Sequence, residues 1–166
     1  GAWIGHDKAK NEQEIEALIK EAKNGYVDIA VVGNEVLLNN ELTEEELLDY
    51  IQRVKVALPN IPVGYVDAYF QFQERPQLVD ACDLILANCY PFWEGCDINY
   101  ASNYLKQMYT ITKNASKGKP VIITETGWPN KGENTKEAKP THENAMKYFI
   151  HTSNWAKEED VKLFYF

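Results

Sequence analysis

The chain has 166 residues, which is enough for one domain with a sizeable core. Hydrophobic residues make up 45% and charged residues 25%, a composition that argues against a disordered or fibrous chain. The formal charge is −8, which argues against a nucleic-acid partner, and the apolar runs are too short to span a bilayer. No signal peptide is recognised at the start of the chain.

The chain repeats one unit, in which a short apolar run is followed by an amphipathic helix. Continuous apolar runs, unlike strictly alternating ones, are typical of parallel strands that are buried on both faces. Strands that alternate with helices predict right-handed βαβ units and a parallel sheet. The predicted strands cover residues 2–4, 28–32, 62–66, 84–87, 121–124 and 163–166.

Helix signals follow most of these runs. Asn11 with Glu14 predicts the start of the first helix. Thr43 with Glu46 forms a capping-box pattern, and Pro59 ends the helix that follows. Two further helices are predicted over residues 100–111 and after residue 141, with a short one near 77–79. The aromatic residues on these helices are predicted to belong to the core.

Such a sheet closes in one of two ways, as an open doubly wound sheet or as a barrel. An open sheet that binds nucleotides would carry a glycine-rich phosphate loop after an early strand. Neither G-x-G-x-x-G nor G-x-x-x-x-G-K-[ST] occurs in the chain. A barrel instead places its chemistry at the carboxyl ends of several strands.

Two glutamates directly follow predicted strands, Glu35 in V-G-N-E and Glu125 in T-E-T-G-W-P. Because side chains alternate along a strand, we expect Glu35 to share a face with Gly33, and Glu125 with Ile123. If these faces point into a barrel, the two carboxylates converge across its mouth. One such glutamate alone would be read as a solvated or helix-capping residue. Two in matching positions favour a functional pair.

Paired carboxylates are the groups that glycoside hydrolysis requires. One is protonated and donates to the leaving oxygen, and the other is ionised and attacks the anomeric carbon. Aromatic rings near the strand ends fit sugar binding, because their faces stack on the C–H faces of pyranose rings. Ordinary packing explains each ring equally well when it is considered alone. These aromatic residues are Tyr69, Tyr90, Phe92, Trp93 and Trp128.

The motifs V-V-G-N-E-V-L at 31–37 and I-T-E-T-G-W-P at 123–129 resemble the two active-site signatures of glycoside hydrolase family 17. The segment A-N-C-Y-P-F at 87–92 resembles the end of that family's sixth strand, and the resemblance runs from Trp3 to Phe166. It implies an α/β fold, the (β/α)8 TIM barrel, of which about six strands lie in this chain. Residues 1–166 would form a single partial barrel domain that lacks the first two βα units and the C-terminal end.

The resemblance also implies an activity, that of a retaining β-1,3-glucanase or glucanosyltransferase. Glu35 would be the general acid/base, Glu125 the nucleophile that forms a glucosyl-enzyme, and Asn34 the residue that holds the sugar 2-OH. The predicted substrate-binding residues are Asn34, Tyr90, Phe92 and Trp128, from the resemblance, and Tyr69, from its place near a strand end. No metal or organic cofactor is implied. The expected partner is a β-glucan, the complete enzyme is expected to be a monomer, and its location is expected to be extracellular or in the cell wall.

Two alternatives stay open: a non-catalytic glucan-binding barrel, and a retaining glycosidase for another β-glucan linkage. Activity is expected of the parent enzyme and not of the fragment alone. A zinc or disulfide framework is not supported, because Cys82, Cys89 and Cys96 include no C-x-x-C pair. These cysteines are predicted to be buried free thiols.

Overall fold

Five parallel strands form one sheet in the order β1-β2-β3-β4-β5, so each strand pairs with its neighbour in the sequence. The computed structural model describes all 166 residues. The strands are β1 (Ala30–Asn34), β2 (Val63–Ala68), β3 (Ile85–Asn88), β4 (Val121–Thr126) and β5 (Lys162–Tyr165). The helices are α1 (Lys8–Lys23), α2 (Glu44–Ala57), α3 (Tyr69–Glu74), α4 (Pro76–Ala81), α5 (Ile98–Ala115) and α6 (His142–Glu158).

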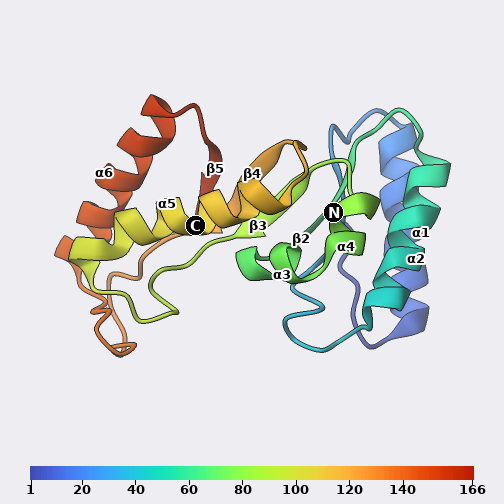
Figure 1. Cartoon of the computed structure of the whole chain (residues 1–166). Coiled ribbons are helices and arrows are strands. Elements are labelled where there is room, and N and C mark those ends of the chain that lie inside the picture. Colours follow the sequence, from blue (N-terminus) through green and yellow to red (C-terminus); the bar gives the residue numbers. More distant parts are fainter.

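This strand order excludes the doubly wound alternative, in which the order reverses at a switch point. The chain instead winds in one direction, from α1 and α2 at one end of an arc to α6 and β5 at the other (Figure 1). An all-parallel sheet with sequential order and intervening helices is part of a barrel wall. The predicted α/β fold class is therefore confirmed as a partial barrel.

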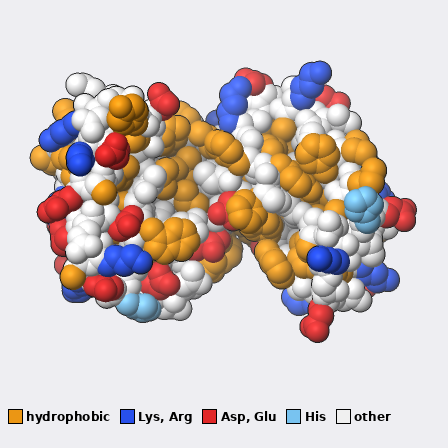
Figure 2. Space-filling view, turned by 180° about the vertical axis from the view of Figure 1, so that it is seen from behind, with side chains coloured by type: hydrophobic (Ala, Val, Ile, Leu, Met, Phe, Trp, Pro, Cys, Tyr) orange, Lys and Arg blue, Asp and Glu red, His pale blue; other side chains and the backbone are white.

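The two faces of the sheet are covered differently. A main core of 35 buried residues joins one face of the strands to the helices. A second cluster, on the other face, contains residues only from strands and the positions just before them. Its members are Val66, Leu84 and Leu86, with Ile29, Val31 and Ile122 packed against them. Seen from behind, the molecule has two lobes with a constriction between them, and apolar side chains gather over both (Figure 2).

The first predicted strand is reduced to a single bridge between Ala2 and Val32. Ala2 donates to Val31 O at 2.9 Å and accepts from Gly33 N at 3.1 Å. No strand flanks this segment on its other side, so it gains no second row of ladder bonds. The sheet thus has five strands and one bridge, where the sequence predicted six strands.

The helix starts match the predictions unevenly. The capping box of α2 is present, with Thr43 Oγ1 accepting from Glu46 N at 3.2 Å and Glu46 accepting from Thr43 N at 3.0 Å. The predicted start of α1 at Asn11 is wrong, because Asp7 caps that helix. Asn11 is instead buried and exchanges two hydrogen bonds with the backbone of Gly5. A buried amide that anchors the chain has the same sequence signature as a cap.

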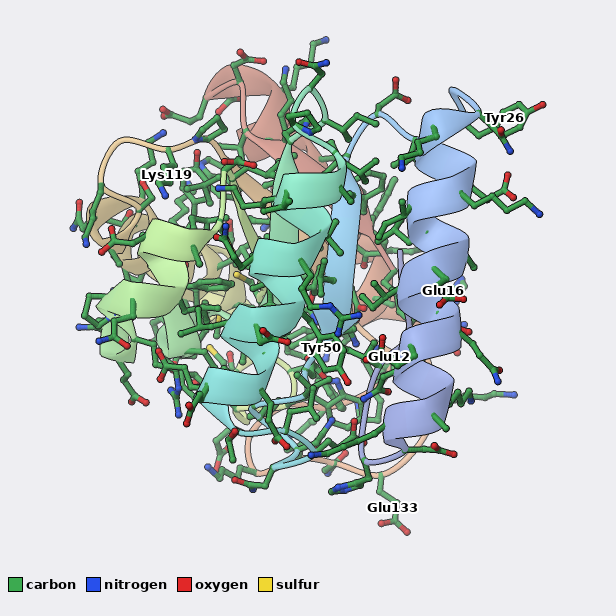
Figure 3. All side chains as sticks on the ribbon, turned by 90° about the vertical axis from the view of Figure 1, so that its right-hand side faces the viewer. Glu12, Glu16, Tyr26, Tyr50, Lys119 and Glu133 are labelled. Atoms are coloured by element: carbon green, nitrogen blue, oxygen red, sulfur yellow. The ribbon has the colours of Figure 1, made fainter.

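The two N-terminal helices lie side by side and are joined by polar contacts (Figure 3). Arg53 of α2 forms two bonds with the Glu12 carboxylate of α1, at 2.9 and 2.5 Å. The same guanidinium lies 5.3 Å from the centre of the Tyr50 ring. These partly exposed contacts orient the pair, and the buried apolar stripe of each helix supplies most of the stability. No helix of the chain is both long and apolar enough to cross a membrane.

Lys119, just before β4, ties the loop there to the end of α4 (Figure 3). Its ammonium donates to the carbonyl oxygens of Val79 at 2.6 Å, Asp80 at 3.0 Å and Cys82 at 2.5 Å. Hydrogen bonds to a charged group contribute about 1.5–3 kcal/mol, so Lys119→Met should lower the free energy of unfolding by about that amount. Urea unfolding measures the change. Lys117→Met, which removes only a surface pair with Asp80, should cost less than about 1 kcal/mol.

Candidate active site

The two predicted catalytic glutamates lie at the same edge of the sheet. Glu35 directly follows β1, and Glu125 is the penultimate residue of β4. In a parallel sheet the carboxyl ends of all strands meet at one edge, where barrel enzymes place their chemistry. The strands β2 and β3 lie between the two glutamates and contribute further polar side chains to this edge.

Each of the two strands carries one extra residue just before its glutamate. In β1, Asn34 is three residues after Val31, but their partners on β2, Gly64 and Val66, are only two residues apart. In β4, Thr126 is likewise three residues after Ile123, whereas their partners on β5 are only two residues apart. The β2–β3 pairing has no such shift. A bulge of this kind re-aims side chains next to functional sites, and here one precedes each carboxylate.

The bulge in β4 overturns the expected alternation of faces. Ile123 packs in the main core, on the side of the helices. Thr124 bonds to Asn88 at the end of β3 and Glu125 to Tyr90 just after it, whereas Thr126 bonds to Tyr148 of α6 at 2.7 Å. The sequence predicted that Glu125 shares a face with Ile123. This prediction is wrong, because the two side chains lie on opposite faces. The extra residue shifts the alternation by one position, and this turns Glu125 toward the other carboxylate.

The backbone at Glu35 is in a conformation that few side chains adopt. Its φ is +55°, and Gly33 two residues earlier has φ +85°. A left-handed non-glycine residue costs about 1–3 kcal/mol and persists only where its surroundings impose it. Here Glu35 N donates to Val66 O at 2.9 Å, and Glu35 O accepts from Asn39 N at 2.9 Å. The chain therefore holds the acid in place through its backbone as well as its side chain.

The two carboxylates are connected through the end of β3. Asn88 Nδ2 donates to Glu35 Oε1 at 2.9 Å, and the Tyr90 hydroxyl donates to Glu125 Oε2 at 2.9 Å. Burial raises the pKa of Tyr90, and its hydrogen bond to Glu125 and the charges of Glu125 and Glu35 raise that pKa further. Tyr90 therefore keeps its proton at neutral pH and donates it in the hydrogen bond to Glu125.

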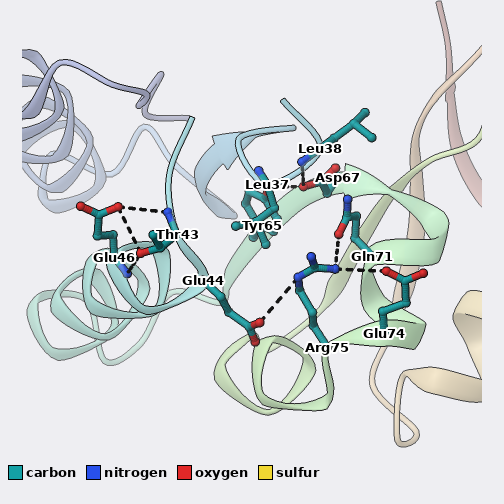
Figure 4. A network of polar contacts seen from close by, with 10 residues as sticks. All are labelled: Leu37, Leu38, Thr43, Glu44, Glu46, Tyr65, Asp67, Gln71, Glu74 and Arg75. Carbon is teal, nitrogen blue, oxygen red and sulfur yellow. Dashed lines mark hydrogen bonds and ion pairs between the residues drawn. The ribbon is translucent and has the colours of Figure 1, made fainter. Parts of the chain in front are cut away.

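A buried tyrosine–aspartate pair on β2 holds the loop that follows Glu35 (Figure 4). The Tyr65 hydroxyl donates to Asp67 Oδ2 and accepts from Leu37 N at 3.0 Å. The same Asp67 oxygen accepts from Leu38 N at 3.4 Å, while its other oxygen accepts from Ala68 N at 2.7 Å. Asp67 is fully buried. The sequence analysis did not single it out, although it follows a buried run just as Glu35 does.

Burial raises the pKa of Asp67 above its ordinary value of 3.8, and the charge of Glu35 adds to this. The folded state thus keeps a proton that the unfolded chain has released, and stability falls as pH rises through this window. The stability of the wild type relative to Asp67→Asn should therefore be higher at about pH 4 than at about pH 7, as measured by urea unfolding. Asp80→Asn should show the opposite slope, because Lys117 lowers the pKa of Asp80.

The predicted aromatic residues have unequal access to a ligand. Phe92 and Trp128 are 2% and 5% exposed and pack edge to face at 5.1 Å. The Trp128 ring nitrogen donates to Lys139 O at 2.9 Å. Rings so covered leave little surface for stacking on a sugar, and Trp128 also lines a shallow cavity with Pro129 and Phe149. That both rings line the sugar cleft stays a prediction. Trp93, in contrast, is 64% exposed, with its ring packed at 81° to that of Phe92.

The contacts of Tyr69 are with residues other than the two glutamates. It opens α3, packs edge to face on Phe70, and is half-buried. Its pKa is raised by burial, with smaller effects from Tyr104 and Glu94. Tyr104 in turn donates to Glu94, which follows Trp93. Tyr69 thus belongs to a tyrosine–glutamate cluster beside the exposed tryptophan.

The cysteines carry no sign of chemistry. All three are free, and Cys82 and Cys89 are buried as predicted, while Cys96 is only partly covered. Burial raises the pKa of Cys82 to about 11, so its thiol stays protonated at neutral pH. The structure holds no group of three or more His, Cys, Asp or Glu side chains placed to bind a metal ion.

Asn88 is the second residue of this edge that the sequence analysis did not place in the site. Sequence reasoning favoured charged and aromatic residues, and an asparagine at a strand end gave a weaker signal. The available signal was its position: Asn88 is 3% exposed, ends a buried run, and stands two residues before Tyr90.

Comparison with known protein families gives a match over the whole chain. The family described as "BtgE/BtgC glycoside hydrolase domain" matches residues 1–166. The chain is 27% identical over 149 residues to a glucan endo-1,3-beta-glucosidase btgC of Emericella nidulans, which covers 81% of this chain and 23% of that protein. It is 29% identical over 140 residues to the cell surface mannoprotein MP65 of Candida albicans, covering 78% and 37%. The chain thus spans well under half of these two relatives.

Solved structures agree on the fold. A glycoside hydrolase family 17 beta-1,3-glucanosyltransferase from Rhizomucor miehei superposes with a TM-score of 0.91 and 33% identity. The match covers 100% of this chain and 63% of that one. An active-site mutant of the same enzyme, in complex with laminaritriose, matches with the same TM-score and 34% identity. The partial barrel is therefore the barrel of that family.

Proposed function

We infer the function from the premise that the chain belongs to the BtgE/BtgC glycoside hydrolase domain family. We propose that residues 1–166 form part of one catalytic barrel domain that cleaves or transfers β-1,3-glucan with retention of configuration. The observation that carries the proposal is the pair Glu35 and Glu125, which lie at one sheet edge and accept hydrogen bonds from Asn88 and Tyr90, respectively. Matching relatives named as β-1,3-glucan enzymes support the substrate class.

In the first step, Glu125 is the nucleophile. Its Oε2 accepts the Tyr90 hydrogen bond, so Oε1 is free to attack the anomeric carbon. The bond from that carbon to the glycosidic oxygen breaks, and Glu35 transfers its proton to the leaving oxygen. Asn34 is proposed to bind the sugar 2-OH, where hydrogen bonds strengthen in the transition state.

In the second step, Glu35 changes from acid to base. It accepts a proton from water or from a sugar hydroxyl, and the resulting oxygen attacks the anomeric carbon. The ester bond to Glu125 breaks, and its carboxylate is restored. Two inversions give net retention. Water as the acceptor gives hydrolysis, and a second glucan gives transfer.

The expected location follows from relatives rather than from the chain. One matching protein is named a cell surface mannoprotein. We therefore propose that the protein acts at the cell surface or in the wall. Fractionation of the source cells, followed by detection of the protein, tests this.

The stereochemical course of the reaction tests the proposed function. The whole protein is incubated with laminari-oligosaccharides, and the anomeric protons of the product are followed by NMR. We expect the β-anomer to appear first and to equilibrate slowly with the α-anomer. Initial release of the α-anomer would mean inversion and would contradict a glucosyl-enzyme on Glu125.

A panel of β-1,3-, β-1,4-, β-1,6- and mixed-linked glucans tests the substrate. Fastest turnover of the β-1,3-glucan supports the proposal. Faster turnover of another linkage would favour a different retaining glycosidase. Tight binding of laminari-oligosaccharides without any product would mean a glucan-binding barrel and would overturn the catalytic assignment.

A further inference from the structure

Asn88 is a buried polar side chain on β3, a strand that lies between the two that lead to the proposed catalytic glutamates. It ends β3 and is only 3% exposed. Burial of an amide without partners is costly, so the partners of a buried amide are part of what keeps it there. The partners of Asn88 therefore indicate what it is there to hold.

Those partners come from β4 and from the end of β1. Asn88 Nδ2 donates to Glu35 Oε1 at 2.9 Å and, more weakly, to Asn34 Oδ1 at 3.4 Å. Asn88 Oδ1 accepts from the Thr124 hydroxyl at 2.9 Å. The amide thus has a partner on its nitrogen and on its oxygen. One side chain contacts both the proposed acid/base and the residue proposed to bind the sugar 2-OH.

The acceptors on one side of Asn88 set which way its amide faces, and the Thr124 hydroxyl holds the amide oxygen on the other side. If the amide were turned over, its oxygen would meet Glu35 Oε1 and Asn34 Oδ1, which are both acceptors when Glu35 is ionised. In the observed orientation the Thr124 hydroxyl donates to the amide oxygen, and every group has a suitable partner. Thr124 occupies the extra position of the β4 bulge, so the same irregularity that turns Glu125 also supplies this contact.

We propose that Asn88, held in place by Thr124, is a positioning residue that determines which oxygen of Glu35 carries the catalytic proton. The proposal rests on the proposed function. An amide N–H can only donate, so Glu35 Oε1 acts as an acceptor in both protonation states. A carboxylic acid has a single O–H, which is then on Oε2. That oxygen gives the proton to the leaving group and later takes one from water or sugar.

A purely structural role for Asn88 predicts a different outcome. A residue that only ties strands together would, when removed, lower stability and slow every substrate alike. A residue that places the proton matters when the leaving group needs protonation, and matters little when it does not. Substrates with good and poor leaving groups therefore separate the two roles.

The experiment compares three variants of the whole protein: Asn88→Leu, Thr124→Val and Thr124→Ser. For each, kcat/KM is measured on laminari-oligosaccharides and on 2,4-dinitrophenyl β-laminaribioside, whose leaving group departs without a proton. Asn88→Leu should lose about 10–100-fold on the oligosaccharide and less than about threefold on the aryl glycoside. Thr124→Val should show the same split with a smaller loss. Thr124→Ser keeps the hydroxyl and should resemble the wild type.

Equal losses on both substrates would overturn the assignment, as would a Thr124→Ser variant that is as impaired as Thr124→Val. If Asn88→Leu does not fold, which urea unfolding shows, the two Thr124 variants decide the question. Failure of the proposed function looks different: the wild type itself would turn over neither substrate. A wild type that is active, with variants that lack the split, refutes only the role of Asn88.

Discussion

Glu125→Gln should reduce turnover of laminari-oligosaccharides by at least about 10³-fold, equivalent to about 4 kcal/mol of transition-state stabilisation. The amide has nearly the shape of the carboxylate and can still accept from the Tyr90 hydroxyl, so the fold and the site remain assembled. It lacks the negative charge and nucleophilic oxygen that form the glucosyl ester. Steady-state assays of the whole protein measure the loss.

Covalent trapping makes the role of Glu125 specific. With an activated 2-deoxy-2-fluoro glycoside, the wild type should gain the mass of one sugar, located by peptide mapping on Glu125. The Glu125→Gln variant should gain none. Glu133→Gln, at an exposed position, is the matched control and should behave as the wild type. A sugar adduct on any other residue, or near-normal turnover of Glu125→Gln, would end the nucleophile assignment.

Glu35→Gln is expected to have the second largest effect, a loss of about 10²–10⁴-fold on natural glucan, which is the usual contribution of a general acid. The loss should depend on the leaving group. The dinitrophenolate of an aryl glycoside departs without a proton, so formation of the glucosyl-enzyme should be nearly unaffected. Its breakdown still needs the base, so the glucosyl-enzyme should accumulate. Rapid-mixing assays would show this as a burst of dinitrophenol followed by slow turnover.

Azide distinguishes loss of the acid/base from general damage. It attacks the glucosyl-enzyme without base assistance, so it should restore turnover of Glu35→Gln on the aryl substrate and yield a β-glucosyl azide. Glu16→Gln, exposed on α1, should show neither the burst nor the effect of azide (Figure 3). An α-glucosyl azide, or no response to azide, would mean that Glu35 and Glu125 have been assigned to the wrong steps.

The sequence predicted those parts of the fold that depend on short-range signals. The capping box at Thr43, the cap at Thr141 and the strand runs predicted at 28–32 and 121–124, observed at 30–34 and 121–126, all carry their information within a few residues. The same local signals were ambiguous at Asn11, where a cap pattern turned out to be a buried anchor for Gly5. They were also insufficient at Ala2, where strand formation depends on neighbours far away in the sequence.

The sequence points to candidate site residues but does not predict their geometry. Glu35 and Glu125 are recognisable because a charged residue directly after a buried run is costly and therefore informative. The bulges are not recognisable, because the extra residue is defined only by the register of the neighbouring strand. Asp67 and Asn88 were missed because their partners, Leu38 and Glu35, lie far from them along the chain.

The extra residue in β4 also interrupts the register of that strand with both of its neighbours. Removal of a single residue between Ile123 and Thr126 would give β4 the same step as both of its neighbours, and the ladder would gain regularity. The same deletion would swing the carboxylate of Glu125 into the layer beneath the helices, where no substrate reaches it. The irregular hydrogen bonding at this point of the sheet is therefore what places the carboxylate for reaction. The segment from Ile123 to Thr126 should tolerate point substitutions far better than any change in length.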